Sequence, residues 1–214
     1  MSISDEKIKI KICGITDIED ARLAVELGAD YLGLIFCRSP RRLTTSQACR
    51  LIAELPGGIA RVGVFMDQPL EEVKEIDRCC RLDYLQFHGR ETPEFYRGFG
   101  PRAIKAVRVA TTLDLEGLDR WETDLVVLDS SVGGRSGGTG MSFPWEWVRG
   151  VGNGSPRIIL GGGLNPYNVA MAIERSQPYA VDVSSGVEAR PGKKDPYKLS
   201  AFINAVRQAE KRCA

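Results

Sequence analysis

The chain has 214 residues, of which 43% are hydrophobic, and this is enough for one sizeable core but leaves little room for two. Its 29 Lys and Arg residues nearly balance its 28 Asp and Glu residues, and a net charge of +1 gives no global field that would attract nucleic acid or a membrane surface. The first residues, MSISDEKIKI, lack the apolar stretch of a signal peptide, and no run approaches the ~20 apolar residues that cross a bilayer. We therefore expect one domain over 1–214, a cytoplasmic location, and neither a nucleic-acid nor a membrane partner.

The cysteine pattern is typical neither of a disulfide framework nor of a zinc site. The chain has six cysteines but no secretory signal, so we expect the thiols to be reduced. Only Cys79 and Cys80 are close in sequence, and His88 is the single histidine, so the ligand spacings of structural zinc are absent. We therefore expect no metal.

Short β-branched runs alternate along the chain with amphipathic segments rich in Ala, Leu, Glu and Arg. In chain order, the predicted strands are 8–13, 31–36, 60–66, 83–88, 103–109, 125–130, 157–162 and 180–185. The predicted helices are 17–27, 44–55, 69–81, 165–175 and 196–212, and several begin with a capping residue or an early proline. Two connections between strands lack a clear helical pattern: 91–99 is short and interrupted by proline, and 130–144 is a glycine-rich loop.

This alternation predicts the fold. Strands that recur with helical crossovers form a parallel sheet, and eight such units in a chain of this length favour closure into a single (β/α)₈ TIM barrel. An open doubly wound sheet is the alternative. In a TIM barrel the chemistry lies at the carboxyl ends of the strands and in the loops that follow. Polar, reactive and glycine residues gather at these predicted strand ends: Cys13, the segment FCRSPRR (36–42), Asp67, His88, Arg108, Asp129, 161–163 and 184–186.

Two of the strand-end segments predict a phosphate site. The loops after the seventh and eighth strands read LGGGLNP and DVSSGVE, and in phosphate-binding barrels these two loops direct backbone N–H groups at the anion. Glycines can instead shape tight turns, but their presence in both loops favours phosphate binding. The sequence GGRSGGTG lacks the Lys-Ser/Thr ending of a P-loop and the dinucleotide fingerprint, so we expect no nucleotide cofactor there. The predicted phosphate-binding residues are Gly161, Gly162, Gly163, Ser184, Ser185 and Gly186.

Cys13 and Asp129 are the candidate base and acid. Asp129 ends the apolar run LVVLD, so burial is expected to raise the pKa of its carboxyl group and keep a fraction protonated near neutral pH. A thiol has a reference pKa of about 8.5, and nearby cations can increase the thiolate fraction of Cys13. The alternatives are a buried structural cysteine and an aspartate that caps the following loop.

The segments KICGIT, SPR, VGVF, LQFHG, IKA, LDS with the later GGTG, GGLNPYNV and VDVSSGVEARPGKKD resemble successive motifs of the phosphoribosylanthranilate isomerase family of the tryptophan pathway. The resemblance covers nearly the whole chain. It implies a (β/α)₈ barrel that converts N-(5′-phosphoribosyl)anthranilate into 1-(o-carboxyphenylamino)-1-deoxyribulose 5-phosphate, an Amadori rearrangement that needs no cofactor. It also implies that Cys13 is the general base and Asp129 the general acid.

The same resemblance implies that Arg41 binds the anthranilate carboxylate. The segment FCRSPRR is one residue shorter than the family's pattern and carries an extra arginine, so Arg38 and Arg42 are alternatives for this role. We expect His88 to have an orienting role. Asp182 resembles a family aspartate that helps to hold the substrate and the site, although a buried aspartate that accepts backbone hydrogen bonds is an equal alternative.

Other functions compatible with these motifs are another phosphosugar isomerase or epimerase barrel and a noncatalytic barrel that binds a phosphate ligand. The first would usually place an acidic residue or a metal-binding histidine at the position of Cys13, and the second would not need both Cys13 and Asp129. We expect a small-molecule partner, the phosphosugar–anthranilate substrate. The sequence leaves open whether the protein is a monomer or a homodimer.

Overall fold

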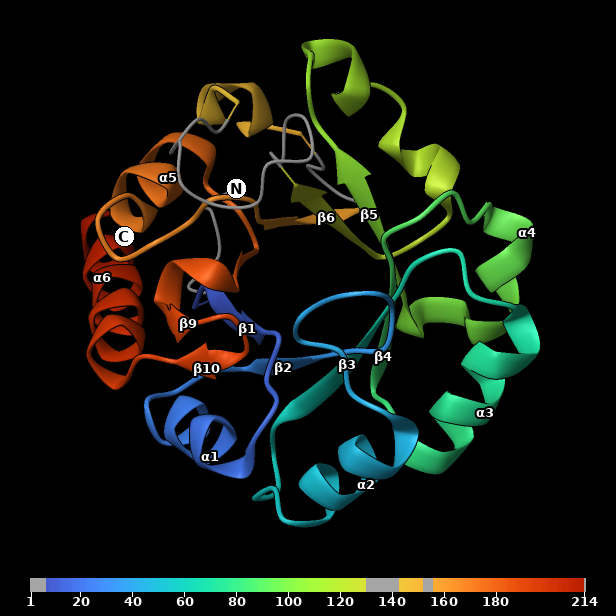
Figure 1. Cartoon of the computed structure of the whole chain (residues 1–214). Coiled ribbons are helices and arrows are strands. Elements are labelled where there is room, and N and C mark those ends of the chain that lie inside the picture. Colours follow the sequence, from blue (N-terminus) through green and yellow to red (C-terminus); the bar gives the residue numbers. More distant parts are fainter. Residues whose placement is uncertain (1–6, 130–142, 152–155, 214) are drawn as a thin grey trace.

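The computed structural model describes residues 7–129, 143–151 and 156–213. Eight parallel strands form a closed barrel in chain order, with helices around the outside (Figure 1). β8 pairs directly with β1, with Val181 opposite Ile10, so the predicted (β/α)₈ barrel is confirmed and the alternative open sheet is wrong. The strands are β1 (Lys9–Cys13), β2 (Tyr31–Ile35), β3 (Ala60–Phe65), β4 (Tyr84–Phe87), β5 (Ala103–Arg108), β6 (Leu125–Asp129), β7 (Arg157–Leu160) and β8 (Ala180–Val183).

The longer helices lie where the sequence predicts them. Asp17 caps the first, where its side chain accepts a hydrogen bond from the Asp20 N–H, and Thr44 and Gln47 form a capping box at the second. None of the described helices combines the length and the apolar composition that crossing a membrane requires. The α-helices of the described chain are α1 (Ile18–Glu26), α2 (Thr45–Ala53), α3 (Leu70–Cys80), α4 (Pro93–Tyr96), α5 (Val169–Ser176) and α6 (Pro196–Cys213).

On one side of the barrel, short helical turns replace full helices. After β4, the helix α4 has only four residues and leads into a 3₁₀ segment that Gly100, with a φ of 56°, and Pro101 interrupt. This agrees with the sequence of 91–99, which is short and interrupted by proline. The 3₁₀ segments are η1 (Arg97–Arg102), η2 (Thr112–Leu115), η3 (Leu118–Trp121), η4 (Trp145–Val148) and η5 (Ser185–Val187).

A small hairpin after η5 was not predicted from the sequence. β9 (Glu188–Arg190) and β10 (Lys193–Lys194) pair antiparallel around Gly192, whose φ is 82°. The hairpin is fastened to the loop after β1, because the Thr16 hydroxyl donates a hydrogen bond to the Gly192 carbonyl. Its two strands have three and two residues, which is too short for the alternation that reveals a strand in a sequence. It brings polar side chains to the end of β1 and β8.

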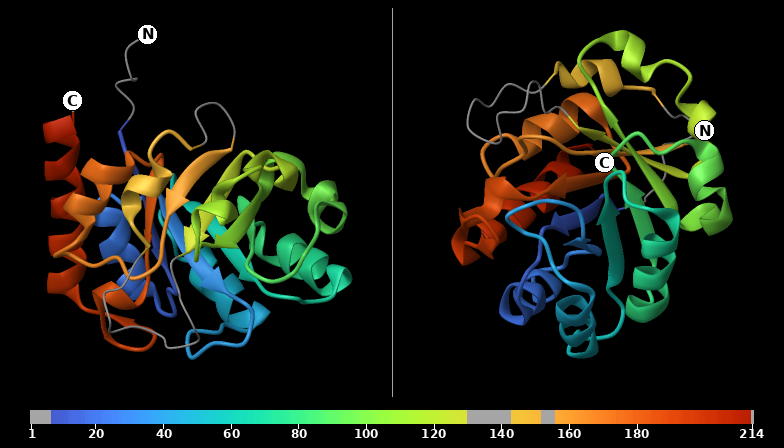
Figure 2. Two further views of the ribbon diagram at one scale, coloured as in Figure 1. Left: turned by 90° about the horizontal axis from the view of Figure 1, so that it is seen from above. Right: turned by 45° about the vertical axis from the view of Figure 1, so that its right-hand side comes forward.

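The strands divide the buried residues into an outer and an inner set. Outward residues such as Ile10 and Ile12 pack against the surrounding helices, among which α6 runs along the outside of the barrel (Figure 2). Inward apolar residues fill the barrel interior: Tyr31, Val62, Ile104, Ala106, Leu125, Val127, Ile159 and Ala180. Because side chains alternate along a strand, Lys11 and Cys13 both point inward from β1. The alternation of side chains along each strand thus determines which polar groups point into the barrel interior.

Candidate active site

The carboxyl ends of the strands bring the predicted polar residues to one end of the barrel, the end that faces the viewer in Figure 1. Cys13 ends β1, His88 follows β4, and Asp129 ends β6. Asp182 lies in β8, one inward position below Ser184. Residues far apart in the sequence therefore share one end of the barrel, which is the arrangement that the sequence predicts.

Cys13 lies in a tight position at this end. Its side chain is buried and packs with Ile35, Cys37 and Val64. Gly33 is its partner across the β1–β2 pair, and a Cβ atom at Gly33 would lie only 2.7 Å from the Cys13 Sγ. A side chain at position 33 would thus collide with the Cys13 sulfur, so the thiol occupies the space that Gly33 of β2 leaves open.

Burial raises the pKa of the Cys13 thiol above its ordinary value. The positive charges of Lys11 and Lys194 and a hydrogen bond from Lys11 oppose this effect, whereas the negative charge of Asp182 adds to it. Nearby cations are present, as expected, but they do not outweigh burial. In the free protein the thiol therefore stays protonated to a higher pH than an exposed cysteine would.

A buried ion pair lies directly beneath Cys13. The Lys11 side chain has no solvent exposure, and its Nζ donates a hydrogen bond of 2.9 Å to the Asp182 Oδ2. The other oxygen of Asp182 is buried and has no hydrogen-bond partner among the described residues. Asp182 is thus held by a lysine ammonium group, and its second oxygen is available to a ligand.

The sequence analysis missed Lys11, although a signal for it was present. The run IKIKIC resembles a strand with one wet face, but every strand of a parallel barrel is buried on both faces. A lysine at position 11 then has to lie inside the barrel, where it needs an acidic partner.

Asp129 is connected to His88, and His88 to Gln86. The His88 Nε2 lies 3.1 Å from the Asp129 Oδ2, and the Gln86 Nε2 lies 3.4 Å from the His88 Nδ1. A proton on the His88 Nε2 would be donated to the Asp129 carboxylate. The predicted orienting residue therefore contacts the predicted acid, and the buried Gln86, which the sequence analysis did not single out, contacts the other ring nitrogen of His88.

Among the three arginines of the shortened loop, only Arg41 turns into the site. Its side chain lies over Gly14, where a Cβ atom would be 2.5 Å from the Arg41 Cδ, and Gly14 follows Cys13 directly with a φ of 75°. Arg38 and Arg42 are exposed. The geometry favours Arg41 over its two neighbours for a role at Cys13.

Arg41 already has an acidic partner. Its Nε and Nη2 donate hydrogen bonds of 2.7 and 2.6 Å to the two carboxylate oxygens of Glu188 in β9. Lys194 also binds Glu188, at 3.1 Å, and donates to the carbonyls of Cys13 at 2.7 Å and Ser184 at 3.1 Å. Burial alone would raise the pKa of Glu188, but Arg41 and Lys194 hold it below its ordinary value. Glu188 and Lys194 were missed because the hairpin that carries them was not predicted.

The two predicted phosphate loops pack against each other. Gly162 and Gly163 adopt positive φ angles of 79° and 70°, which favour glycine. Gly186 has no room for a side chain, because a Cβ atom there would collide with the Leu164 carbonyl oxygen of the neighbouring loop. The Ser184 hydroxyl is buried and has no hydrogen-bond partner among the described residues. The structure thus brings the predicted phosphate-binding residues of both loops together, with Ser185 and Gly186 in the short turn η5.

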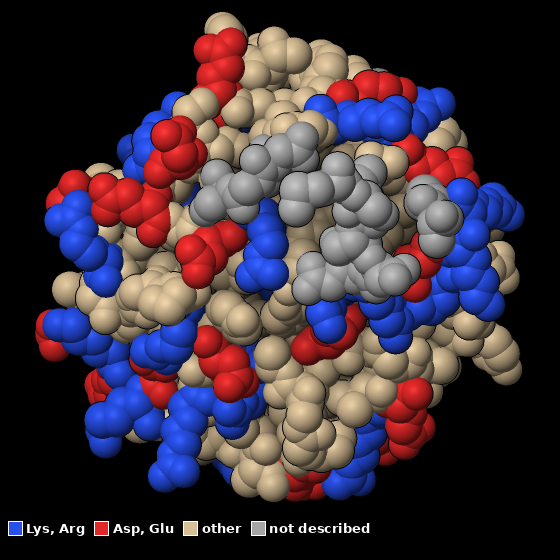
Figure 3. Space-filling view, turned by 180° about the vertical axis from the view of Figure 1, so that it is seen from behind, with Lys and Arg blue, Asp and Glu red and all other residues tan. Residues whose placement is uncertain are grey.

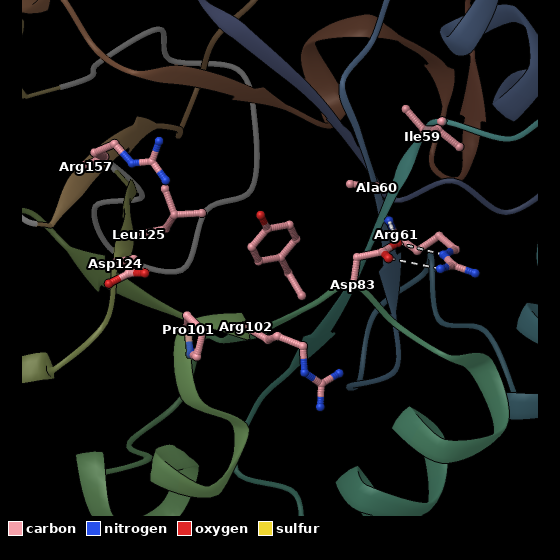
Figure 4. Close-up of a pocket in the computed structure, with 11 residues that line it drawn as sticks. Ile59, Ala60, Arg61, Asp83, Pro101, Arg102, Asp124, Leu125 and Arg157 are labelled. Atoms are coloured by element: carbon pink, nitrogen blue, oxygen red, sulfur yellow. Dashed lines mark hydrogen bonds and ion pairs between the residues drawn. The ribbon is translucent and has the colours of Figure 1, made fainter.

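A cavity of about 630 Å³ opens at the other end of the barrel, lined by the first residues of β3, β4, β6 and β7 and by residues that directly precede β3 to β6 (Figure 4). Two of its arginines have acidic partners: the Arg61 Nε lies 2.7 Å from the Asp83 Oδ2, and the Arg102 Nη2 lies 2.8 Å from the Asp77 Oδ2. The guanidinium group of the third, Arg157, lies over the ring of Tyr179. On the face behind that of Figure 1, basic and acidic side chains are intermingled (Figure 3). The cavity contains none of the predicted acid, base and phosphate-binding residues, so we do not assign the active site to it.

No group of three or more His, Cys, Asp and Glu side chains in the described ranges is arranged to hold a metal ion. The glycine-rich sequence GGRSGGTG, at 133–140, lies outside the described residues. The candidate site described above consists of the carboxyl ends of the strands and of the loops after β1, β2, β7 and β8.

Comparisons with known proteins agree with this site. The family model described as N-(5′-phosphoribosyl)anthranilate (PRA) isomerase matches residues 10–205. An N-(5′-phosphoribosyl)anthranilate isomerase of Moorella thermoacetica is 47% identical over 204 residues, which are 95% of this chain and 91% of the relative. One of Pelobacter propionicus is 45% identical, over 94% of this chain and 96% of the relative.

Solved structures give the same result. A phosphoribosyl anthranilate isomerase from Thermotoga maritima has a TM-score of 0.87 and 38% identity, over 94% of this chain and 99% of its own. A phosphoribosyl anthranilate isomerase in complex with reduced 1-(o-carboxyphenylamino)-1-deoxyribulose 5-phosphate has a TM-score of 0.83 and 38% identity, with the same coverage. The family match, the curated relatives and the solved structures together show that this chain belongs to the N-(5′-phosphoribosyl)anthranilate isomerase family.

Proposed function

We propose that this chain, as one barrel domain over 1–214, catalyses the Amadori rearrangement of N-(5′-phosphoribosyl)anthranilate to 1-(o-carboxyphenylamino)-1-deoxyribulose 5-phosphate in tryptophan biosynthesis. The observation that carries the proposal is the placement of a thiol, a carboxyl group held by a histidine, and two packed glycine loops at one end of a barrel of this family. The proposed reaction is an intramolecular isomerisation by general acid–base catalysis and uses no cofactor.

Asp129 is the proposed general acid. Protonation of the furanose ring oxygen opens the ring and leaves an iminium group between C1′ and the anthranilate nitrogen. The hydrogen bond of 3.1 Å from His88 fixes the orientation of the Asp129 carboxyl group. His88 therefore acts as a positioning residue.

Cys13 is the proposed base. After ring opening, the iminium group withdraws electrons from C2′ and makes its proton acidic, so a thiolate suffices to remove it. The C2′–H electron pair forms the C1′–C2′ double bond, the iminium nitrogen becomes neutral, and the proton moves to Cys13. The resulting enolamine tautomerises to the ketone. The positive charge of the iminium group also favours ionisation of a thiol that burial otherwise keeps neutral.

The two ends of the substrate bind to different parts of the site. We assign the phosphate to the loops after β7 and β8, where Gly162, Gly163 and Gly186 allow close approach of the backbone. We assign the anthranilate carboxylate to Arg41. Glu188 occupies its Nε and Nη2, so Nη1 is the donor that we assign to the carboxylate.

The buried oxygens without partners suit the sugar. The Asp182 Oδ1 can accept a hydrogen bond from a sugar hydroxyl, and the Ser184 hydroxyl can donate to the phosphate or the sugar. A bound substrate would thus satisfy two polar groups for which the described residues offer no partner. This arrangement favours a phosphosugar over an apolar ligand.

Turnover by the purified protein tests the function directly. Supplied with N-(5′-phosphoribosyl)anthranilate in the presence of a chelator and without nucleotide, the protein should abolish the anthranilate-type fluorescence. Complementation of a tryptophan auxotroph that lacks this isomerase tests substrate and reaction together. If the protein binds phosphosugars but the fluorescence persists, it is one of the two alternatives, another phosphosugar isomerase or a noncatalytic binding barrel.

For the remaining properties we propose a cytoplasmic protein, monomeric or homodimeric, that has no nucleic-acid partner. A Thermotoga maritima relative described as dimeric has 38% identity and a TM-score of 0.83 over 94% of this chain and 99% of its own, which supports the homodimer as one of the two states. Light scattering distinguishes them.

A further inference from the structure

Lys11 is a buried lysine that the proposed reaction steps do not use. It points inward from β1 two residues before Cys13, and its position in the register is opposite Asp182 of β8. We propose that Lys11 is a positioning residue that holds a permanent positive charge beside the Cys13 sulfur, and that Asp182 keeps Lys11 in place. This inference rests on the proposed function, because it concerns the group that we assign as the base.

The contacts of Lys11 support this role. The Lys11 ammonium group donates a hydrogen bond of 2.9 Å to the Asp182 Oδ2, and Lys11 lies on the same inward face of β1 as Cys13, two residues before it. Burial would lower the pKa of Lys11, but the charges of Asp182 and Cys13 and the hydrogen bonds to both raise it above its ordinary value. Lys11 therefore stays protonated, so it can stabilise a thiolate but cannot itself remove the C2′ proton.

The other charged groups around Cys13 are engaged elsewhere. Lys194 donates to the carbonyls of Cys13 and Ser184 and to Glu188, which accounts for the three protons of its ammonium group. Arg41 is bound to Glu188 through two of its nitrogens. Of the cations near Cys13, Lys11 has the charge that opposes the raised pKa of the thiol most strongly. The titratable and charged groups that face Cys13 from the surrounding elements are Lys11 of β1, Asp182 of β8, Lys194 of β10, and Cys37 and Arg41 of the loop after β2. Glu188 of β9 binds Arg41 and Lys194.

The pair Lys11–Asp182 also explains why a buried base can work. A thiolate without a counter-ion is strongly disfavoured inside a protein, and the active proton acceptor would then be missing. An ammonium group at a fixed position lowers this penalty without itself changing charge during the reaction. Asp182 balances the charge of Lys11 and keeps it from leaving the site.

The ionisation of Cys13 can be measured without turnover. The pH dependence of iodoacetamide alkylation is followed by mass spectrometry of the peptide that contains Cys13. In Lys11→Gln and Lys11→Met, removal of the positive charge should raise the alkylation pKa by about one unit or more, so that alkylation near neutral pH becomes at least about tenfold slower. Gln can still donate a hydrogen bond to Asp182, which separates the loss of charge from the loss of packing.

The matched control is Lys9→Met. Lys9 lies two residues earlier on β1, is part-exposed, and forms an ion pair with Asp30 at 3.1 Å at the amino end of the strand. Its replacement should leave the Cys13 alkylation pKa unchanged. An equal shift in Lys9→Met and Lys11→Met would show a general effect of the strand and overturn the proposal.

Asp182→Asn should shift the Cys13 alkylation pKa in the direction opposite to that of the Lys11 variants. The amide oxygen of the asparagine can still accept a hydrogen bond from Lys11 and hold it in place, while the negative charge that opposes ionisation is lost, so the Cys13 alkylation pKa should fall. This variant decides the question if the Lys11 variants do not fold, because Asn replaces Asp at nearly the same size. An unchanged or raised pKa in Asp182→Asn, or an unchanged pKa in a folded Lys11→Gln, would overturn the proposal. A wild-type protein without turnover would instead contradict the proposed function and leave these alkylation results interpretable.

Discussion

Glu188 binds both Nε and Nη2 of Arg41, at 2.7 and 2.6 Å, so the arginine that we assign to the anthranilate carboxylate is held by a carboxylate of the protein itself. Arg41→Ala should raise KM by about 10- to 100-fold and lower kcat less, because the carboxylate contact exists in both the ground and the transition state. Glu188→Gln should raise KM by a smaller factor, since Arg41 remains but is less firmly held. Steady-state kinetics of the two variants measure both effects.

Arg38→Ala and Arg42→Ala are the matched controls for Arg41, because both residues belong to the same loop and are exposed. Neither should change KM by more than about twofold, a surface-sized effect. A larger increase in KM for either control than for Arg41→Ala would assign the carboxylate to that arginine instead.

Asp129→Asn tests the proposed acid. The change keeps the size and polarity of the side chain but removes the transferable proton, so kcat should fall by at least ~10² with a small change in KM. Asp67→Asn is the control, since Asp67 follows β3 at the same end of the barrel and its φ of 54° is one that asparagine tolerates. Near-normal kcat in Asp129→Asn would remove Asp129 from the mechanism.

Gly186→Ala tests the packing of the phosphate loops. The added Cβ atom would collide with the Leu164 carbonyl oxygen, so we expect a loss of about 1–3 kcal/mol in the free energy of unfolding and a higher KM. Gly57→Ala is the control, because a Cβ atom at Gly57 meets no atom within 4 Å, and its effect should stay within about 0.5 kcal/mol. Thermal denaturation measures the loss of stability, and equal stability of the two variants would contradict the close contact.

Much of the fold could be predicted because the strands and helices of a (β/α)₈ barrel can be recognised from the hydrophobic periodicity of short sequence segments. Each strand is a short β-branched run, and helix starts such as Asp17 and Thr44 carry capping side chains that act within a few residues. The hairpin β9–β10 could not be predicted in this way. Its five strand residues include four charged ones, and it is held by contacts such as that of Thr16 with Gly192, which are 176 residues apart.

In the site, too, some residues could be predicted from the sequence and others depend on contacts between distant segments. Cys13, His88 and Asp129 could be singled out because strand ends of a barrel converge, so their positions in the sequence predict a shared location. The pairings Lys11–Asp182 and Arg41–Glu188 depend on which face of a strand points inward and on the unpredicted hairpin. The cations near Cys13 act in the expected direction, but the degree of burial, which outweighs them, is a property of the folded barrel that the sequence does not show.

The phosphate loops predict competitive inhibition by simple phosphosugars. Backbone N–H groups bind the anion, so a chelator should leave the inhibition constant unchanged. Inhibition should weaken as the pH falls below about 6, because protonation of the phosphate then removes the dianion. A requirement for magnesium, or inhibition that strengthens at acidic pH, would contradict the assignment of the phosphate to these loops.

The thiol of Cys13 should be protected at neutral pH and reactive at alkaline pH. Burial raises the pKa of the Cys13 thiol above its ordinary value, so the folded protein holds the thiol in its protonated form to a higher pH than that of an exposed cysteine. Inactivation by iodoacetamide should therefore be slow near pH 7 and accelerate through and above pH 9. A bound phosphosugar should slow it by covering the site. Inactivation that is as fast at neutral as at alkaline pH would contradict the raised pKa.

Three variants separate Cys13 from Cys37, which is also buried and packs in the same cluster. Cys37→Ala should stay active and alkylation-sensitive, because we assign Cys37 only to packing. Cys13→Ser should lose kcat by ~10² or more, since a hydroxyl is a far weaker base than a thiol, and Cys13→Ala should be at least as inactive. Gly33, which makes room for the Cys13 sulfur, leaves space for either smaller side chain, so the two Cys13 variants should fold normally. Substantial kcat in a folded Cys13→Ala would make Cys13 a structural residue and leave the C2′ proton without a base.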